Sequence, residues 1–134
     1  MKYKKVKEYY GSGKLRRRYF VDENGKKCGE VRSLHGNGQS CCCQFSLNGY
    51  DYGEAKEFDH DGTILHHYLM DGRGNALADV INCGKPSTHS EEQLIEIAKE
   101  HNLPLLSEIP KTEAEVTLWN LKYPDCPCLP IESK

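Results

Sequence analysis

The 134-residue sequence lacks any long hydrophobic run. No stretch approaches the ~20 consecutive apolar residues that a membrane-spanning helix needs. The chain begins MKYKKVKEYYGSGK, which is charged and is not followed by the apolar segment of a secretory signal peptide. We therefore expect a cytoplasmic protein that does not span a membrane.

Apolar residues are scarce as well, at 37% of the chain, and the aromatic residues comprise 8 Tyr, 3 Phe and 1 Trp. A chain of this length forms one domain, and this composition supplies only a thin core. A single-layer sheet with a small helical cover is compatible with such a thin core. The net charge of -2 gives no global attraction to nucleic acid or to anionic membranes.

Catalytic motifs are missing too. The sequence contains no nucleophile elbow, no phosphate-binding loop and no HExxH motif. His60 lies in Asp59-His60-Asp61-Gly62, which has the composition of a tight turn. His66 and His67 would point to opposite faces of a strand. We expect no enzymatic activity.

The seven cysteines do not have the spacing of a zinc site, which normally offers two pairs of ligands separated by two to four residues. The alternative is a metal site that joins Cys126 and Cys128 to Cys83 or to Cys41–Cys43, together with His66 and His67. In a reducing compartment the simpler interpretation is that the thiols serve as small apolar side chains. We expect no cofactor and no bound metal.

What the chain does contain is a repeat with a period of about 24 residues. A fixed period of this length indicates stacked structural units that bury a core only against their neighbours. The positions that keep the interval are Gly13, Gly38 and Gly62, then Gly25 and Gly49, and the dipeptides Gly29-Glu30 and Gly53-Glu54.

Each glycine of the repeat lies in a cluster typical of hairpin turns, such as Asn48-Gly49 or Asp61-Gly62. The segments between the clusters are long enough for short strands. The sequence thus predicts a mainly β (α+β) protein, with an antiparallel β-meander of about seven strands over residues 1–82. The expected strands are residues 3–10, 14–21, 28–35, 39–46, 53–59, 63–70 and 75–82.

Residues 83–134 have a helical pattern, which we interpret as a C-terminal two-helix tail of the same domain. Ser90-Glu91-Glu92-Gln93 and Thr112-Glu113-Ala114-Glu115 both have the form of a capping box. The apolar side chains of the second helix are Val116, Leu118, Trp119, Leu121 and Tyr123. We expect these helices to cover the sheet, and a dimer or partner interface is the alternative.

Three segments of the repeat region are Tyr9-Tyr10-Gly11-Ser12-Gly13-Lys14-Leu15, Asn24-Gly25-Lys26-Lys27-Cys28-Gly29-Glu30 and Gly36-Asn37-Gly38-Gln39. Through these segments, residues 6–75 resemble the MORN-type repeat variant of YwqK-like antitoxin proteins. The resemblance implies an antiparallel β-meander and a binding role, with toxin neutralisation as one member activity, and it implies no catalytic residues.

Basic residues concentrate at the start of the chain, where Arg16 and Arg18 fall on one face of a predicted strand. Such a cationic face can dock on an acidic protein surface, and tyrosine and arginine dominate many interfaces. The candidate partner-binding residues are Tyr9, Arg16, Arg18, Arg32, Tyr50 and Tyr52, the last two from a predicted Tyr50-Asp51-Tyr52 loop.

The sequence therefore predicts a non-catalytic protein-binding module, antitoxin-like or inhibitory, that occludes an intracellular toxin or enzyme. Bacterial and viral counter-defence settings fit equally well. A nucleic-acid or nucleotide-binding module that uses the same basic strand face is the alternative, and a cysteine-liganded metal protein is a second one.

Overall fold

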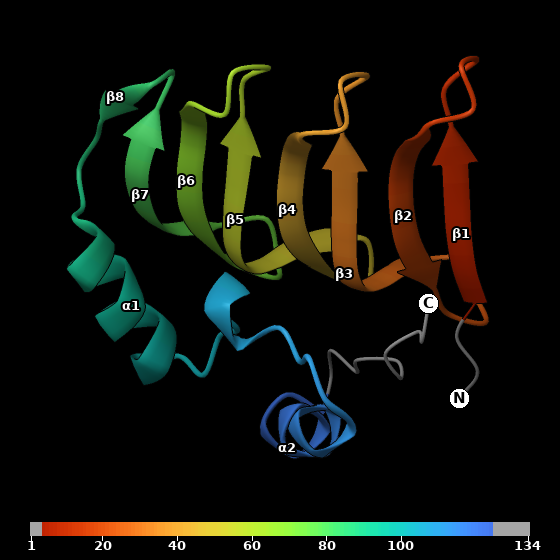
Figure 1. Cartoon of the computed structure of the whole chain (residues 1–134). Coiled ribbons are helices and arrows are strands. Elements are labelled where there is room, and N and C mark those ends of the chain that lie inside the picture. Colours follow the sequence, from red (N-terminus) through yellow and green to blue (C-terminus); the bar gives the residue numbers. More distant parts are fainter. Residues whose placement is uncertain (1–3, 125–134) are drawn as a thin grey trace.

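The computed structural model describes residues 4–124 as one antiparallel sheet with two helices along one side (Figure 1). The strands lie in the sheet in the same order as in the sequence, which confirms the predicted β-meander and its two-helix tail. The elements are β1 Lys4–Tyr9, β2 Leu15–Val21, β3 Lys27–Leu34, β4 Ser40–Leu47, β5 Tyr50–Phe58, β6 Ile64–Asp71, β7 Ala76–Asn82, β8 Lys85–Pro86, α1 Glu91–Glu100, the 3-10 turn η1 Leu106–Glu108 and α2 Glu113–Lys122.

The glycine turns determine where the strands begin and end, and two details differ from expectation. The predicted Tyr50-Asp51-Tyr52 loop is wrong, because β5 already begins at Tyr50. Asn48 and Gly49 have φ of 53° and 86°, so these two residues complete the hairpin turn alone. The sheet also continues past residue 82, since the short β8 pairs with β7.

Side chains in neighbouring turns join the repeated units. The Tyr10 hydroxyl donates to the Leu34 carbonyl oxygen at 2.6 Å. The next unit repeats this contact between His35 Nε2 and the Phe58 carbonyl oxygen, 2.8 Å apart. The rings of His35 and His60 stack with centroids 4.0 Å apart. These contacts join residues about one repeat period apart, so the repeat aligns side chains that link neighbouring units.

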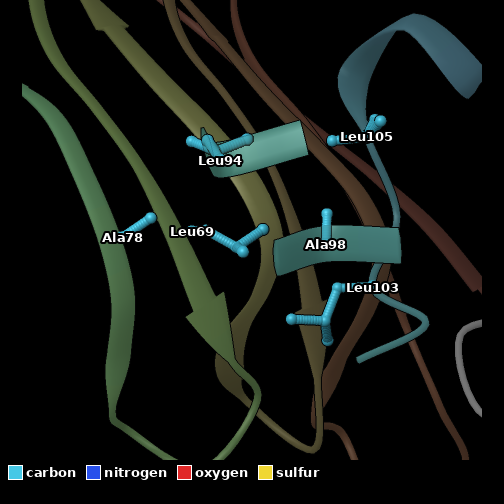
Figure 2. Packing of buried hydrophobic residues seen from close by; sticks show 6 residues of the cluster. All are labelled: Leu69, Ala78, Leu94, Ala98, Leu103 and Leu105. Carbon is cyan, nitrogen blue, oxygen red and sulfur yellow. The ribbon is translucent and has the colours of Figure 1, made fainter. Parts of the chain in front are cut away.

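The first helix covers the C-terminal strands of the sheet. Leu69 on β6 and Ala78 on β7 point toward α1 and the chain that follows it (Figure 2). Burial of one leucine side chain contributes ~1.5–3 kcal/mol. This cluster therefore provides much of the apolar burial that a single-layer sheet cannot provide by itself. Its buried members are Leu69, Ala78, Leu94, Ala98, Leu103 and Leu105.

The second helix covers the middle of the sheet, farther toward the N-terminal strands (Figure 1). Trp119 packs between Phe45 of β4 and Tyr123, with ring centroids 5.2 Å and 4.7 Å away. We expected Leu118 and Leu121 to lie beside this apolar face, but they are 66% and 76% exposed. They lie on the far side of the helix, because each residue rotates about 100° from the last.

The two helices begin as the sequence predicts, with one difference. Ser90 and Gln93 form the reciprocal capping box of α1. At α2 the Glu115 N–H donates to Thr112 Oγ1, but the Glu115 carboxylate accepts from the Lys111 N–H at 2.6 Å. The second box is therefore only half formed. No helix within residues 4–124 is long and apolar enough to cross a membrane.

The segment between the helices is attached to the sheet by polar contacts at Glu54 of β5. The Glu54 N–H donates to the Pro104 carbonyl oxygen at 2.9 Å. The Leu106 N–H donates to Glu54 Oε1 at 2.7 Å, and His67 Nε2 lies 2.6 Å from Glu54 Oε2. Glu54 and His67 are 6% and 2% exposed. Both oxygens of the Glu54 carboxylate therefore have hydrogen-bond partners where the tail crosses the sheet.

A glycine makes this attachment possible. Gly53 has φ of 83°, and β5 bulges there against β4, since Cys43 faces Lys56 while Ser46 faces Asp51. A Cβ at Gly53 would lie 2.5 Å from the Pro104 carbonyl oxygen. The position therefore requires glycine for its backbone conformation and for the close approach of the tail.

Replacing Gly53 with alanine is expected to detach residues 103–106 from the sheet. Gly25→Ala is the matched control, because Gly25 has φ of 79° with open space around it. Both variants incur the cost of a positive φ, about 1–2 kcal/mol. Urea unfolding followed by Trp119 fluorescence should show a further loss of about 2 kcal/mol for Gly53→Ala alone. Equal losses would contradict the close approach.

Candidate functional site

A row of mostly basic side chains crosses the sheet on the face that carries the tail. Directly opposed residues on neighbouring strands share a face. The strand registers place Lys7 opposite Arg18 and Arg18 opposite Arg32, and they continue the row to the far strands. We call it the basic row, and its members are Lys7, Arg18, Arg32, Cys43, Lys56 and His67.

The N-terminal part of the basic row centres on the carboxylate of Glu30. Arg18 and Arg32 both form ion pairs with Glu30, and the Arg32 contact is 3.4 Å long. Lys7 is exposed, and the two arginine side chains are partly exposed. Two guanidinium groups thus share one carboxylate, which leaves guanidinium N–H donors for an anionic group of a partner.

On the opposite face of the same strands, Arg17 is paired with a carboxylate of its own. The Arg17 guanidinium donates to both carboxylate oxygens of Glu8, at 2.8 and 2.9 Å, and lies 5.1 Å from the Tyr19 ring centroid. Hydrogen bonds from Arg17 and from the Tyr19 hydroxyl lower the pKa of Glu8. The neighbours Arg17 and Arg18 therefore have different roles, because alternate residues of a strand point to opposite faces.

The structure brings together only two of the six candidate residues, Arg18 and Arg32. Tyr9 and Arg16 lie at the β1–β2 turn, where the Arg16 guanidinium is 5.9 Å from the Tyr10 ring centroid. Tyr50 is exposed at the other end of the strands, beside the β4–β5 turn. Tyr52 packs against the buried clusters under both helices. The six residues do not form one patch.

Sequence reasoning missed Lys7, Lys56 and the acidic partner Glu30. The repeat could have revealed two of them, since Lys56 follows Arg32 by 24 residues and Glu54 follows Glu30 by the same interval. The sequence analysis noted the recurring Gly-Glu dipeptides but did not extend the period to the basic residues that follow them. Extending it to charged positions identifies the recurring pair of a carboxylate and a nearby base.

At its other end the basic row passes beneath the tail. Burial alone would raise the pKa of Glu54, but hydrogen bonds from His67 and from the Leu106 N–H outweigh it and lower the pKa. The ionised carboxylate is therefore the form that fixes the tail to the sheet. His66, the neighbour of His67, pairs with Glu57 on the opposite face, as the strand alternation predicts.

The cysteines of the described strands have the surroundings of structural thiols. Burial raises the pKa of Cys28 to about 11 and that of Cys42 to about 12. Within residues 4–124 no group of three or more His, Cys, Asp or Glu side chains could hold a metal ion. Cys83 is exposed, and the candidate ligands Cys126 and Cys128 lie outside the described residues.

The turn around His60 is explained by backbone capping. The Asp61 carboxylate accepts the Thr63 N–H at 2.9 Å, and this bond lowers the pKa of Asp61. The His60 N–H donates to Asp59 Oδ1 at 2.7 Å. These side chains are exposed and stabilise the turn.

Comparison with known proteins adds no assignment to this site. No protein-family model, curated protein or solved structure matches the chain.

Glu54→Gln should destabilise the protein in a pH-dependent way. A carboxyl group whose pKa is lowered in the folded state contributes stability above its ordinary value of 4.5, and this contribution disappears as the pH falls through the folded-state pKa. We expect a loss of about 3 kcal/mol at pH 7 that shrinks below pH ~4.5. Denaturant unfolding across pH measures it, with the exposed Glu96→Gln as control. A pH-independent loss would contradict this account.

Proposed function

We propose that the protein is a non-catalytic binding module whose N-terminal basic row docks on an acidic patch of a partner protein. The observation that supports this is the direct opposition of Arg18 and Arg32 on adjacent strands, where both side chains share the carboxylate of Glu30. Strand-borne side chains are held at fixed spacing, so such a row can match a patterned acidic surface.

The binding module acts by occlusion in this proposal, as an antitoxin-like inhibitor of an intracellular toxin or enzyme in the cytoplasm. The resemblance of residues 6–75 to the MORN-type repeat of YwqK-like antitoxins supports the assignment. A rigid meander fits an inhibitory role, because a preordered surface loses little conformational entropy on docking. Arg18 and Arg32, already oriented by Glu30, are its central contacts.

Affinity capture from the native cell, with reciprocal purification of the captured protein, tests the proposal. The double variant Lys7→Glu/Arg32→Gln should bind the purified partner at least about tenfold more weakly, a loss of ~1.4 kcal/mol. Lys99→Glu on the exposed side of α1 makes the same charge reversal as Lys7→Glu, so it is the control and should bind normally. Circular dichroism melting establishes that all variants fold.

Two results would overturn the proposal. One is undiminished partner binding by the double variant. The other is nuclease-sensitive capture, with binding to generic RNA or DNA that falls steeply as salt increases, because phosphate contacts release counterions. That second outcome would assign the basic row to nucleic acid.

A further inference from the structure

Uncovered apolar side chains lie on the outer side of α2. Leu118 and Leu121 are 66% and 76% exposed, and less than one helical turn separates them. The other large apolar side chains that are exposed within residues 4–124 are those of Tyr9 and Tyr50, which lie at strand ends. The two leucines therefore form an exposed aliphatic patch on a helix.

The two helices differ on the side that they turn to solvent. Helix α2 buries Val116 and Trp119 on one side and exposes the two leucines on the other. A helix that covers a sheet needs only one apolar side, whereas two apolar sides are typical of a helix that packs on both. Helix α1 follows the first pattern, because its exposed residues are all polar: Glu91, Glu92, Gln93, Glu96, Lys99 and Glu100.

The apolar surface extends beyond the two leucines. A hollow of about 380 Å³ lies between η1 and α2, and Leu118 forms part of its wall. Ile109 and Trp119 supply further apolar lining, while Glu115 and Lys122 are charged groups along the same hollow. The outer side of α2 therefore offers a ridge of leucines beside a partly apolar depression, a shape that a second helix can fit.

The charges beside the leucines indicate which helix fits. Glu115 and Lys122 are seven residues apart, so they lie along the same edge of the leucine patch, about two turns from one another. An antiparallel copy of α2 reverses this order and brings Glu115 of each copy beside Lys122 of the other. Such flanking charges set the orientation of paired helices. Lys122 also pairs with Glu108 of its own chain, and its side chain remains 52% exposed.

We propose that the outer side of α2 binds a second copy of this chain, with the two α2 helices antiparallel about a two-fold axis. Leu118 of each copy packs against Leu121 of the other, as the self-complementary surface of a two-fold dimer requires. This contact lies on the side of α2 opposite the Trp119 side chain that packs on the sheet. Arg18 and Arg32 are not part of it, so the inference does not depend on the proposed function.

The size of the contact determines its strength. Helix α2 has ten residues and is therefore about 15 Å long. A contact of this length is smaller than a standard protein interface, so the dimer is weak and reversible. Its dissociation constant should lie between about 10 µM and 1 mM, a range in which monomer and dimer can both be observed.

Sedimentation velocity of the full chain over that concentration range tests the proposal. Leu118→Gln/Leu121→Gln should dimerise at least about tenfold more weakly than the wild type, with the fold intact because both side chains are exposed. Tyr50→Gln removes an exposed apolar side chain elsewhere and should dimerise normally. A wild-type protein that stays monomeric, including one whose leucines bind a different protein, would overturn the proposal, as would an undiminished dimer of the double variant.

Complementary charge reversals test the antiparallel arrangement. Glu115→Lys and Lys122→Glu each bring like charges together, so each variant alone should dimerise at least about tenfold more weakly than the wild type. An equimolar mixture should form a heterodimer about as strong as the wild-type dimer, because both contacts then join opposite charges. Circular dichroism melting establishes that each variant folds, since Glu115 and Lys122 also have partners within the chain. Folded variants that do not associate when mixed would contradict the antiparallel pairing.

Discussion

The structure depends on one buried carboxylate, that of Glu54. A single-layer sheet built from a polar sequence cannot bury enough apolar surface by itself, so its stability requires a cover. Glu54 attaches that cover through the Pro104 carbonyl, the Leu106 N–H and His67. A buried charge is tolerated only when its hydrogen bonds are satisfied, and here the tail supplies part of that satisfaction. The sheet therefore depends on the tail as its cover, and the buried Glu54 carboxylate depends on the tail for part of its hydrogen bonding.

The repeat explains how one scaffold carries two different surfaces. Equivalent positions of the basic row hold Arg32 in one unit and Lys56 in the next, each two residues after a bulge glutamate. In the N-terminal unit the glutamate orients Arg18 and Arg32, which remain accessible. In the following unit it binds the tail. The same local geometry thus leaves two arginines accessible in one unit and fixes the tail in the other.

The sequence predicts the strands well because glycines with positive φ determine where turns form, and strand ends follow from them. It failed at the start of β5, where Asn48 and Gly49 form a shorter turn than expected. It did not show which of the candidate binding residues lie together in the fold. Tyr50 and Tyr52 lie far from Arg18 and Arg32 in the sequence, and whether they approach them in the fold depends on cross-strand register, which the turn pattern alone does not specify.

Native-state hydrogen exchange measured by NMR tests most directly the claim that contacts at Glu54 unite sheet and tail. The amides of Glu54 and Leu106 should exchange only through global unfolding, with protection free energies equal to the unfolding free energy from denaturant. Amides of the exposed turn at residues 23–25 provide the fast reference. Exchange of the Glu54 and Leu106 amides as fast as in that turn would contradict the account.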